Sequence, residues 1–214
     1  LTGGNPAREA ALAALRALIS VSPSAVVGCD FPFGLPRLLV DATSWEAFVL
    51  GFAKRYATPE AFRAACRVQA QGRELKRKTD VVAEVPFASY NLRIYRQTFY
   101  GIRDLLGPLV RAGRIAVAPM KRLRQGVALV MEVCPASALK RLGLYEPYKG
   151  RGLDRECTRS RILTTLMARD DVIPPADHLC RRMLSDPKGD ALDSFIAAMI
   201  TFWASRSATS LVTD

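Results

Sequence analysis

The sequence is poor in the residue types that build most metal and nucleophile sites. It has a single histidine, His178, which argues against a Ser-His-Asp triad and against a histidine-rich metal centre. Its five cysteines lie far apart and form no C-x-x-C pair; they are Cys29, Cys66, Cys134, Cys157 and Cys180. This spacing favours reduced cysteines of an intracellular protein over a disulfide framework or a zinc site.

Long apolar runs, a signal peptide and a glycine-rich phosphate loop of the P-loop kind are also missing from the sequence. A membrane-spanning helix needs about 20 consecutive, mostly apolar residues, and a secreted chain needs a leader. We therefore expect a cytoplasmic protein without a membrane partner. The lack of a P-loop argues against a small-molecule phosphotransferase.

Positive charge is abundant instead. Lysine and arginine number 31 against 20 acidic residues, which gives a formal net charge of +11. A balance of this size favours a polyanionic partner, usually nucleic acid; a basic protein without such a partner is the alternative. Half of the residues are hydrophobic, enough for a sizeable core in a single domain over residues 1–214.

The stretch from Val26 to Pro36 predicts a ligand site at the end of a buried strand. A short β-branched run, residues 24–29, precedes Asp30, and a stiff turn rich in proline and glycine follows it. Ligands of open α/β sheets bind beyond the carboxyl ends of the strands, so Asp30 is a candidate site residue. The alternative is that Asp30 caps the next element or hydrogen-bonds its own turn.

Two more acidic residues lie on the last predicted helix, which begins at Asp190 and ends near Arg206. Asp190 and Asp193 are three residues apart and share one face. Asp190 has an alternative role as a first-turn acid favoured by the helix dipole. Asp193 is surrounded by apolar residues on the helix, and a buried carboxylate is costly unless it is paired or bound to a cation.

Two further strands are predicted at residues 115–118 and 127–134, and Glu132 is the one charge in the second of them. A helical insertion of about residues 41–113 separates the first two strands, which indicates the α/β class. The other expected helices are at residues 6–19, after the capping box at 43–46, and at 58–66, 91–111, 136–142, 154–168 and 176–184.

Carboxylates without histidine or thiolate partners suit hard cations such as Mg²⁺ or Mn²⁺. We predict Asp30, Asp190 and Asp193 as metal ligands, because two such ions about 4 Å apart stabilise the attacking and leaving oxygens in phosphodiester hydrolysis. Glu132 is a fourth catalytic candidate, and pairing with a neighbouring arginine is its alternative role.

Basic residues near these acids are candidates for phosphate binding. They are Arg77 and Lys78, in the polar stretch of residues 69–90, and Lys149, in a glycine-rich loop. A solvated basic surface is the alternative interpretation.

These motifs resemble those of domain-of-unknown-function family 429, predicted nucleases with an RNase H-like fold. Residues 28–36 resemble its Asp-x-Pro-x-Gly-Leu-Pro signature, residues 131–136 its Glu-Val-x-Pro strand, and residues 189–194 its terminal Asp-x-x-Asp helix. The last motif is also similar to that of RuvC-type junction resolvases, whose fourth-strand carboxylate corresponds to Asp30. The resemblance covers nearly the whole chain and implies an RNase H-like mixed sheet.

The chain departs from the family at its start. The family's fold begins with an antiparallel three-stranded hairpin that carries the first catalytic aspartate, whereas here the helix at residues 6–19 directly precedes the counterpart of strand four. We therefore expect a hairpin of roughly 30–50 residues upstream of Leu1. The strand ending at Asp30 should then have one bare edge, and this chain alone should be inactive and poorly stable.

The predicted function is divalent-metal-dependent hydrolysis of nucleic-acid phosphodiester bonds. It requires Asp30 within about 4–8 Å of Asp190 and Asp193, and the loop of residues 69–90 at the same strand ends. A non-catalytic nucleic-acid-binding module and a small-molecule phosphotransferase are the alternatives.

Overall fold

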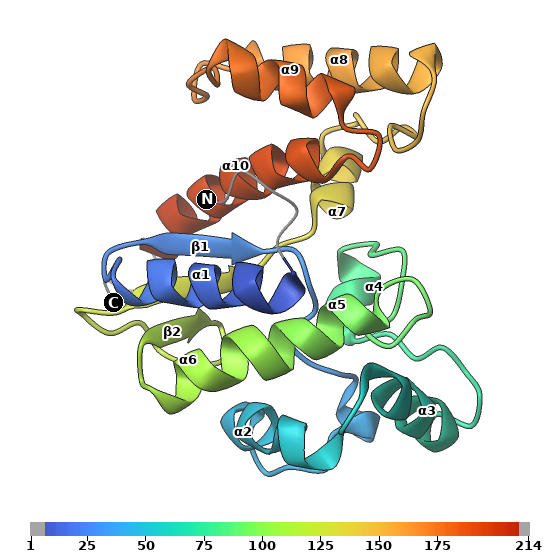
Figure 1. Ribbon diagram of the computed structural model, residues 1–214, viewed down its shortest axis with the longest axis vertical. Coiled ribbons are helices and arrows are strands. Elements are labelled where there is room, and N and C mark those ends of the chain that lie inside the picture. Colours follow the sequence, from blue (N-terminus) through green and yellow to red (C-terminus); the bar gives the residue numbers. More distant parts are fainter. Residues whose placement is uncertain (1–6, 210–214) are drawn as a thin grey trace. The chain divides into compact units, whose positions relative to one another are not determined.

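The computed structural model describes residues 7–209, which divide between Val133 and Cys134 into two compact units (Figure 1). The first unit combines a small parallel sheet with helices, and the described part of the second is helical. The predicted α/β class is therefore confirmed. No helix within residues 7–209 is long and apolar enough to cross a membrane.

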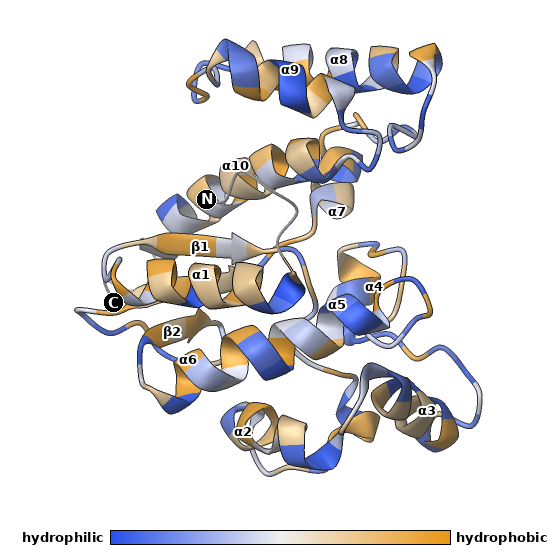
Figure 2. Cartoon of the chain, viewed as in Figure 1, coloured by the Kyte–Doolittle hydropathy of each residue, from blue (hydrophilic) through white to orange (hydrophobic). Residues whose placement is uncertain are grey.

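The sheet of the first unit has three parallel strands in the order β1-β3-β2, namely β1 (Val26–Cys29), β3 (Ala128–Glu132) and β2 (Ile115–Ala118). Cys29 pairs with Glu132 across the β1–β3 ladder. Both β1 and β2 are apolar (Figure 2), as strands covered by helices must be. Because the carboxyl ends of parallel strands lie on the same side of the sheet, Asp30 and Glu132 are both at that end.

Within the described residues, β1 pairs with β3 alone and so lies at the edge of the sheet. This is the edge position that the sequence predicts for the strand ending at Asp30. Val26 is 39% exposed. The hairpin expected upstream of Leu1 lies outside the sequence and stays a prediction, and the expected helix start at Asn5 and Pro6 lies outside the described residues.

Helices occupy the segment between β1 and β2, as expected for the insertion. Ser44 and Thr58 cap two of them by accepting hydrogen bonds from the N–H groups of Ala47 and Ala61, each at 3.1 Å. Such caps satisfy N–H groups that the first helical turn leaves unpaired. The elements are η1 (Arg37–Leu39), α2 (Trp45–Arg55), α3 (Pro59–Gln69), α4 (Lys78–Val82), α5 (Tyr95–Tyr100), the π-helical segment η2 (Gly101–Leu106) and α6 (Gly107–Arg111).

The long helix predicted at residues 91–111 begins later, at Tyr95. The side chain of Asn91 accepts a hydrogen bond from the Arg93 N–H at 2.9 Å, and local bonds of this kind compete with the helix. Helix α1 (Arg8–Ser20) packs against η2. The ring of Phe31, in the turn after β1, lies against Gly101, the first residue of η2. The η2 segment therefore also supports the end of β1.

The second unit contains four helices in its described part. They are α7 (Pro135–Arg141), α8 (Leu153–Met167), α9 (Asp177–Ser185) and α10 (Asp190–Thr209). The core includes Leu139, Ile162, Leu166 and Leu192. The helix boundaries lie within a few residues of those predicted, because glycine and proline mark most of the ends in the sequence.

We predict that Gly101→Ala lowers the free energy of unfolding by about 1–3 kcal/mol, because a methyl group there would overlap the ring of Phe31. Gly51→Ala in α2 is the matched control. No atom lies within 4 Å of a Cβ at Gly51, so this change should stabilise the protein by up to ~1 kcal/mol. Denaturant unfolding measures both, and equal effects would contradict the packing described.

Candidate functional site

Asp30 follows the last residue of β1 and is exposed. Its backbone carbonyl accepts a hydrogen bond from the side-chain amide of Gln97 in α5. The preceding residue, Cys29, is buried, and burial together with the charge of Asp30 raises the pKa of its thiol to about 12. Cys29 is therefore protonated at neutral pH and is not a competent nucleophile.

A cavity of about 420 Å³ opens beside Asp30 within the first unit. Its wall is mostly apolar but includes two arginines. The Arg8 guanidinium carbon lies 3.7 Å from the centroid of the Tyr100 ring, and Arg96 bonds to Glu60 at 2.9 Å. The lining residues are Arg8, Leu12, Leu15, Val27, Gly28, Cys29, Asp30, Phe31, Arg96, Gln97, Tyr100, Gly101 and Leu105. A cavity at a strand end with arginines in its wall suits a ligand that carries anionic groups.

Glu132, at the end of the central strand, forms an ion pair with Arg77 from the polar stretch of residues 69–90. The Arg77 Nη1 donates to Glu132 Oε2 at 2.8 Å, and its Nε donates to the buried Asp80 at 3.0 Å. The sequence suggests an arginine partner for Glu132 without identifying it, and the structure shows that this partner is Arg77. This contact confirms that the stretch reaches the carboxyl end of β3, but the expectation of a loop throughout is wrong, because residues 78–82 form helix α4.

The charge state of Arg77 follows from this pairing. Burial alone lowers the pKa of a guanidinium, but the hydrogen bonds that Arg77 donates to the carboxylates of Glu132 and Asp80 outweigh it and raise the pKa of Arg77 above its ordinary value. The guanidinium is thus a permanent cation shared between two carboxylates. The phosphate contact expected of Arg77 stays a prediction, and a phosphate would have to compete with these two carboxylates. Lys78, the next residue, is exposed.

The turn after β1 is fixed by hydrogen bonds to its backbone. The N–H of Phe33 donates to Glu132 Oε2 at 2.8 Å, and the indole of Trp45 donates to the Phe33 carbonyl at 2.8 Å. The hydroxyl of Ser89 donates to the carbonyl of Gly34 at 2.9 Å. Glu132 thereby joins the turn that follows Asp30 to the loop that carries Arg77.

In the second unit, Asp193 is buried, with 8% of its surface exposed. Its carboxylate accepts a hydrogen bond from the hydroxyl of Tyr148 and one from Lys149 Nζ, the latter at 2.5 Å. A carboxylate held in this way is paired, as its apolar surroundings require. Gly189 is needed here, because a Cβ at this position would lie 2.9 Å from the ring of Tyr148.

Asp190 lies one turn before Asp193 and is exposed. Asp186 accepts hydrogen bonds from the N–H groups of Lys188 and Ala191, each at 3.0 Å, so Asp186 supplies the capping contacts at the start of α10. Asp190 is therefore not needed as the side-chain cap. Its role as a first-turn acid remains available, and so does metal binding.

The acidic residues suit Mg²⁺ or Mn²⁺ by chemistry, because they offer only oxygen ligands. The carboxylate of Asp193 keeps lone pairs beyond the two used by Tyr148 and Lys149. Across residues 7–209, no three histidine, cysteine or acidic side chains are grouped so as to hold a metal ion. Asp30 belongs to one unit and Asp190 and Asp193 to the other, so the predicted three-carboxylate metal site stays a prediction.

Two residues of these networks are missing from the sequence-based prediction. Asp80 is the second partner of Arg77 and gives little signal in a polar stretch. Arg159 in α8 is 3% exposed and donates to the backbone carbonyls of Tyr148 and Leu184, each at 2.7 Å. Its position three and four residues before Ile162 and Leu163 is a usable signal, because this spacing puts a charge on an apolar helix face.

Comparison of the chain with protein-family models, with curated proteins and with solved structures finds no match in any of the three. The resemblance to domain-of-unknown-function family 429 and the RNase H-like topology therefore stay predictions.

We predict that Glu132→Ala lowers the free energy of unfolding by ~3 kcal/mol, because it leaves the Phe33 N–H without its acceptor and Arg77 with one carboxylate instead of two. Glu46→Ala is the matched control. Glu46 forms an exposed pair with Lys121, and such pairs contribute at most about 1 kcal/mol. Urea unfolding compares the two variants, and a loss for Glu132→Ala no larger than the control would contradict a structural role for Glu132.

Proposed function

We propose that this protein is a divalent-metal-dependent nuclease that hydrolyses phosphodiester bonds of nucleic acid. The observation that carries the proposal is the setting of Asp30. It is an exposed carboxylate at the carboxyl end of a parallel strand, beside a cavity with Arg8 and Arg96 in its wall. Ligands bind at this end of parallel sheets, and the arginines favour a polyanionic one.

In this proposal Asp30, Asp190 and Asp193 are the metal ligands. When bound, Mg²⁺ or Mn²⁺ supplies a more acidic water and a positive charge opposite the phosphate. The hydrogen bonds from Tyr148 and Lys149 fix the orientation of the Asp193 carboxylate, so little side-chain entropy is lost when it binds a cation.

The basic residues have separate roles in the proposal. Arg8 and Arg96 hold phosphates of the nucleic acid, together with the exposed Lys78. Lys149, whose side chain is 53% exposed, can donate to a phosphate while it stays next to Asp193. Arg77 is a further candidate for phosphate binding, and its pair with Glu132 also holds the turn after Asp30 in place.

A non-catalytic nucleic-acid-binding module is the second candidate. The net charge of +11 favours it as much as it favours a nuclease, because phosphate contacts alone supply non-specific binding. Cleavage separates the two candidates, since binding alone leaves the phosphodiester bonds intact.

The test is a cleavage assay of the full natural protein with labelled single- and double-stranded DNA and RNA. We expect cleavage with Mg²⁺ or Mn²⁺, none with a chelator, and a loss of at least ~100-fold in Asp190→Asn because a metal ligand becomes neutral. Asp190 is exposed, so Asp190→Asn should lower the free energy of unfolding by less than about 1 kcal/mol.

Asp177→Asn is the matched control, because Asp177 is an exposed first-turn acid of α9 in the same unit. It should cleave like the unmodified protein. Cleavage that survives the chelator, or an equal loss in both variants, would contradict the proposal. Tight nucleic-acid binding without cleavage would establish the binding module instead.

A further inference from the structure

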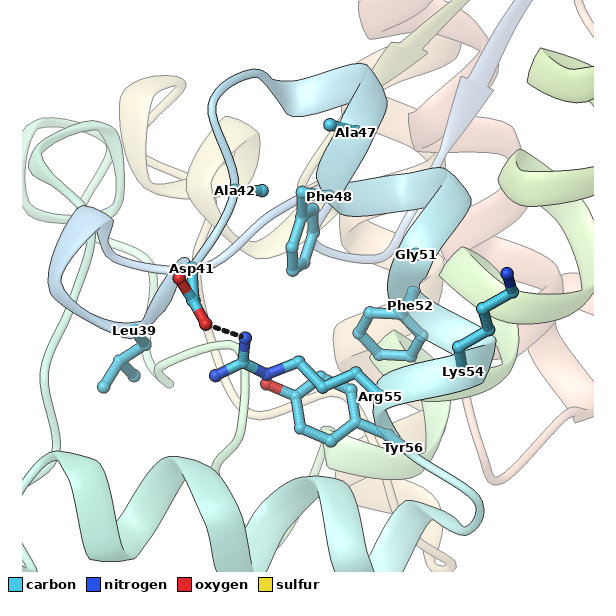
Figure 3. A pocket seen from close by; sticks show the side chains of 10 residues that line it. All are labelled: Leu39, Asp41, Ala42, Ala47, Phe48, Gly51, Phe52, Lys54, Arg55 and Tyr56. Atoms are coloured by element: carbon cyan, nitrogen blue, oxygen red, sulfur yellow. Dashed lines mark hydrogen bonds and ion pairs between the residues drawn. The ribbon is translucent and has the colours of Figure 1, made fainter.

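A second cavity, of about 290 Å³, lies in the helical insertion and contains none of the residues assigned to the proposed nuclease site. Figure 3 shows it between α2 and the segment that precedes this helix. Phe48 and Phe52 give it a buried apolar wall, and Asp41 and Arg55 face each other at its side. Its volume is just below the usual range for ligand pockets, so it can enclose one ring system of a ligand whose remaining groups lie at the rim.

Gly51 is the unusual residue of this cavity. It lies in the middle of α2, where glycine is less favourable than alanine. The other helical glycines described above have a packing reason: Gly101 lies against the Phe31 ring, and a Cβ on Gly107 would lie 3.2 Å from the carbonyl of Ile102. At Gly51 no atom lies within 4 Å of the Cβ position. Packing within the protein therefore does not require glycine there, and the missing Cβ leaves the helix backbone open to the close approach of a ligand.

The polar groups of the cavity define the chemistry of its ligand. Arg55 bonds to Asp41 at 3.0 Å, and 38% of the Arg55 side chain remains exposed. Lys54 is exposed next to it. Two cations and one carboxylate leave a net positive rim, which favours an anionic group. The carboxylate of Asp41 is an acceptor, which suits an amino group on the edge of a nucleobase.

We propose that this cavity binds a nucleoside monophosphate unit, with the base against Phe48 and the open face of Gly51 and the phosphate at Arg55 and Lys54. The site holds the nucleotide by contact with its ring and its charge, and no reaction takes place there. The proposal stands apart from nuclease activity, because it uses different residues and a binding readout.

The probes are the four ribonucleoside 5′-monophosphates, the matching nucleosides and inorganic phosphate, titrated by calorimetry into the full natural protein. Gly51→Leu places a side chain in the cavity from a position whose Cβ has open space around it, and we expect it to weaken monophosphate binding at least tenfold. Ala53→Leu adds similar bulk to an exposed position of the same helix outside the cavity, and it should bind normally. Thermal unfolding checks that both variants are folded.

Arg55→Gln separates the two halves of the ligand. It should weaken the binding of the monophosphates at least fivefold and leave the binding of the nucleosides unchanged. Asp41, its partner, is 83% exposed, so losing the pair should not affect folding. The proposal is overturned if Gly51→Leu binds like Ala53→Leu, if inorganic phosphate binds as tightly as the monophosphates, or if the unmodified protein binds none of the probes.

Discussion

The carboxylate of Glu132 holds together the parts of the first unit that meet at the carboxyl end of its sheet. Among residues 7–209 the sheet has three strands of four or five residues, so its own ladders fix little beyond the strands. Glu132 accepts hydrogen bonds from two groups that are far away in sequence, the Phe33 N–H and the Arg77 guanidinium. The turn after Asp30 and the loop after α3 therefore depend on one side chain of the central strand.

In the second unit, too, a carboxylate is held by residues from a loop that is distant in sequence. Asp193 is buried on an apolar helix, and Tyr148 and Lys149 pair with it. Arg159 in turn holds the backbone of this loop by donating to the carbonyls of Tyr148 and Gly150. In both units an acidic residue is fixed by a cation from a distant loop. An exposed acidic residue accompanies it: Asp30 lies at the same strand ends as Glu132, and Asp190 lies three residues before Asp193 in the sequence. A pre-oriented carboxylate beside an accessible one is a suitable starting arrangement for cation binding.

Much of the fold follows from local sequence signals. Strand β2 matches its predicted range and Thr58 caps α3 where the sequence indicates it, because capping and strand ends depend on neighbouring residues. The capping box at 43–46 predicts Thr43 as the cap of α2, whereas the structure has Ser44, one residue later. The late start at Tyr95 was not predictable from periodicity, since the Asn91 side chain competes with the helix only through its own local bond. Helix α4 also has no periodic signal, because it is five residues long.

The site was less predictable than the fold. The setting of Asp30 at a strand end follows from the pattern of residues 24–36, and the burial of Asp193 follows from its apolar helix. Their partners do not, because Arg77 is 55 residues from Glu132 and Lys149 is 44 residues from Asp193. Pairing over such separations is decided by tertiary packing, which composition and spacing do not encode.

The central claim is that Asp30 and Asp190 bind a catalytic divalent cation. The most direct measurement is a Mn²⁺ titration of the full natural protein, followed by electron paramagnetic resonance of the free ion, in unmodified, Asp30→Asn and Asp190→Asn forms. We expect saturable binding that each substitution weakens at least tenfold, because each removes a charged ligand. Absence of saturable binding, or equal affinity in all three forms, would contradict the claim.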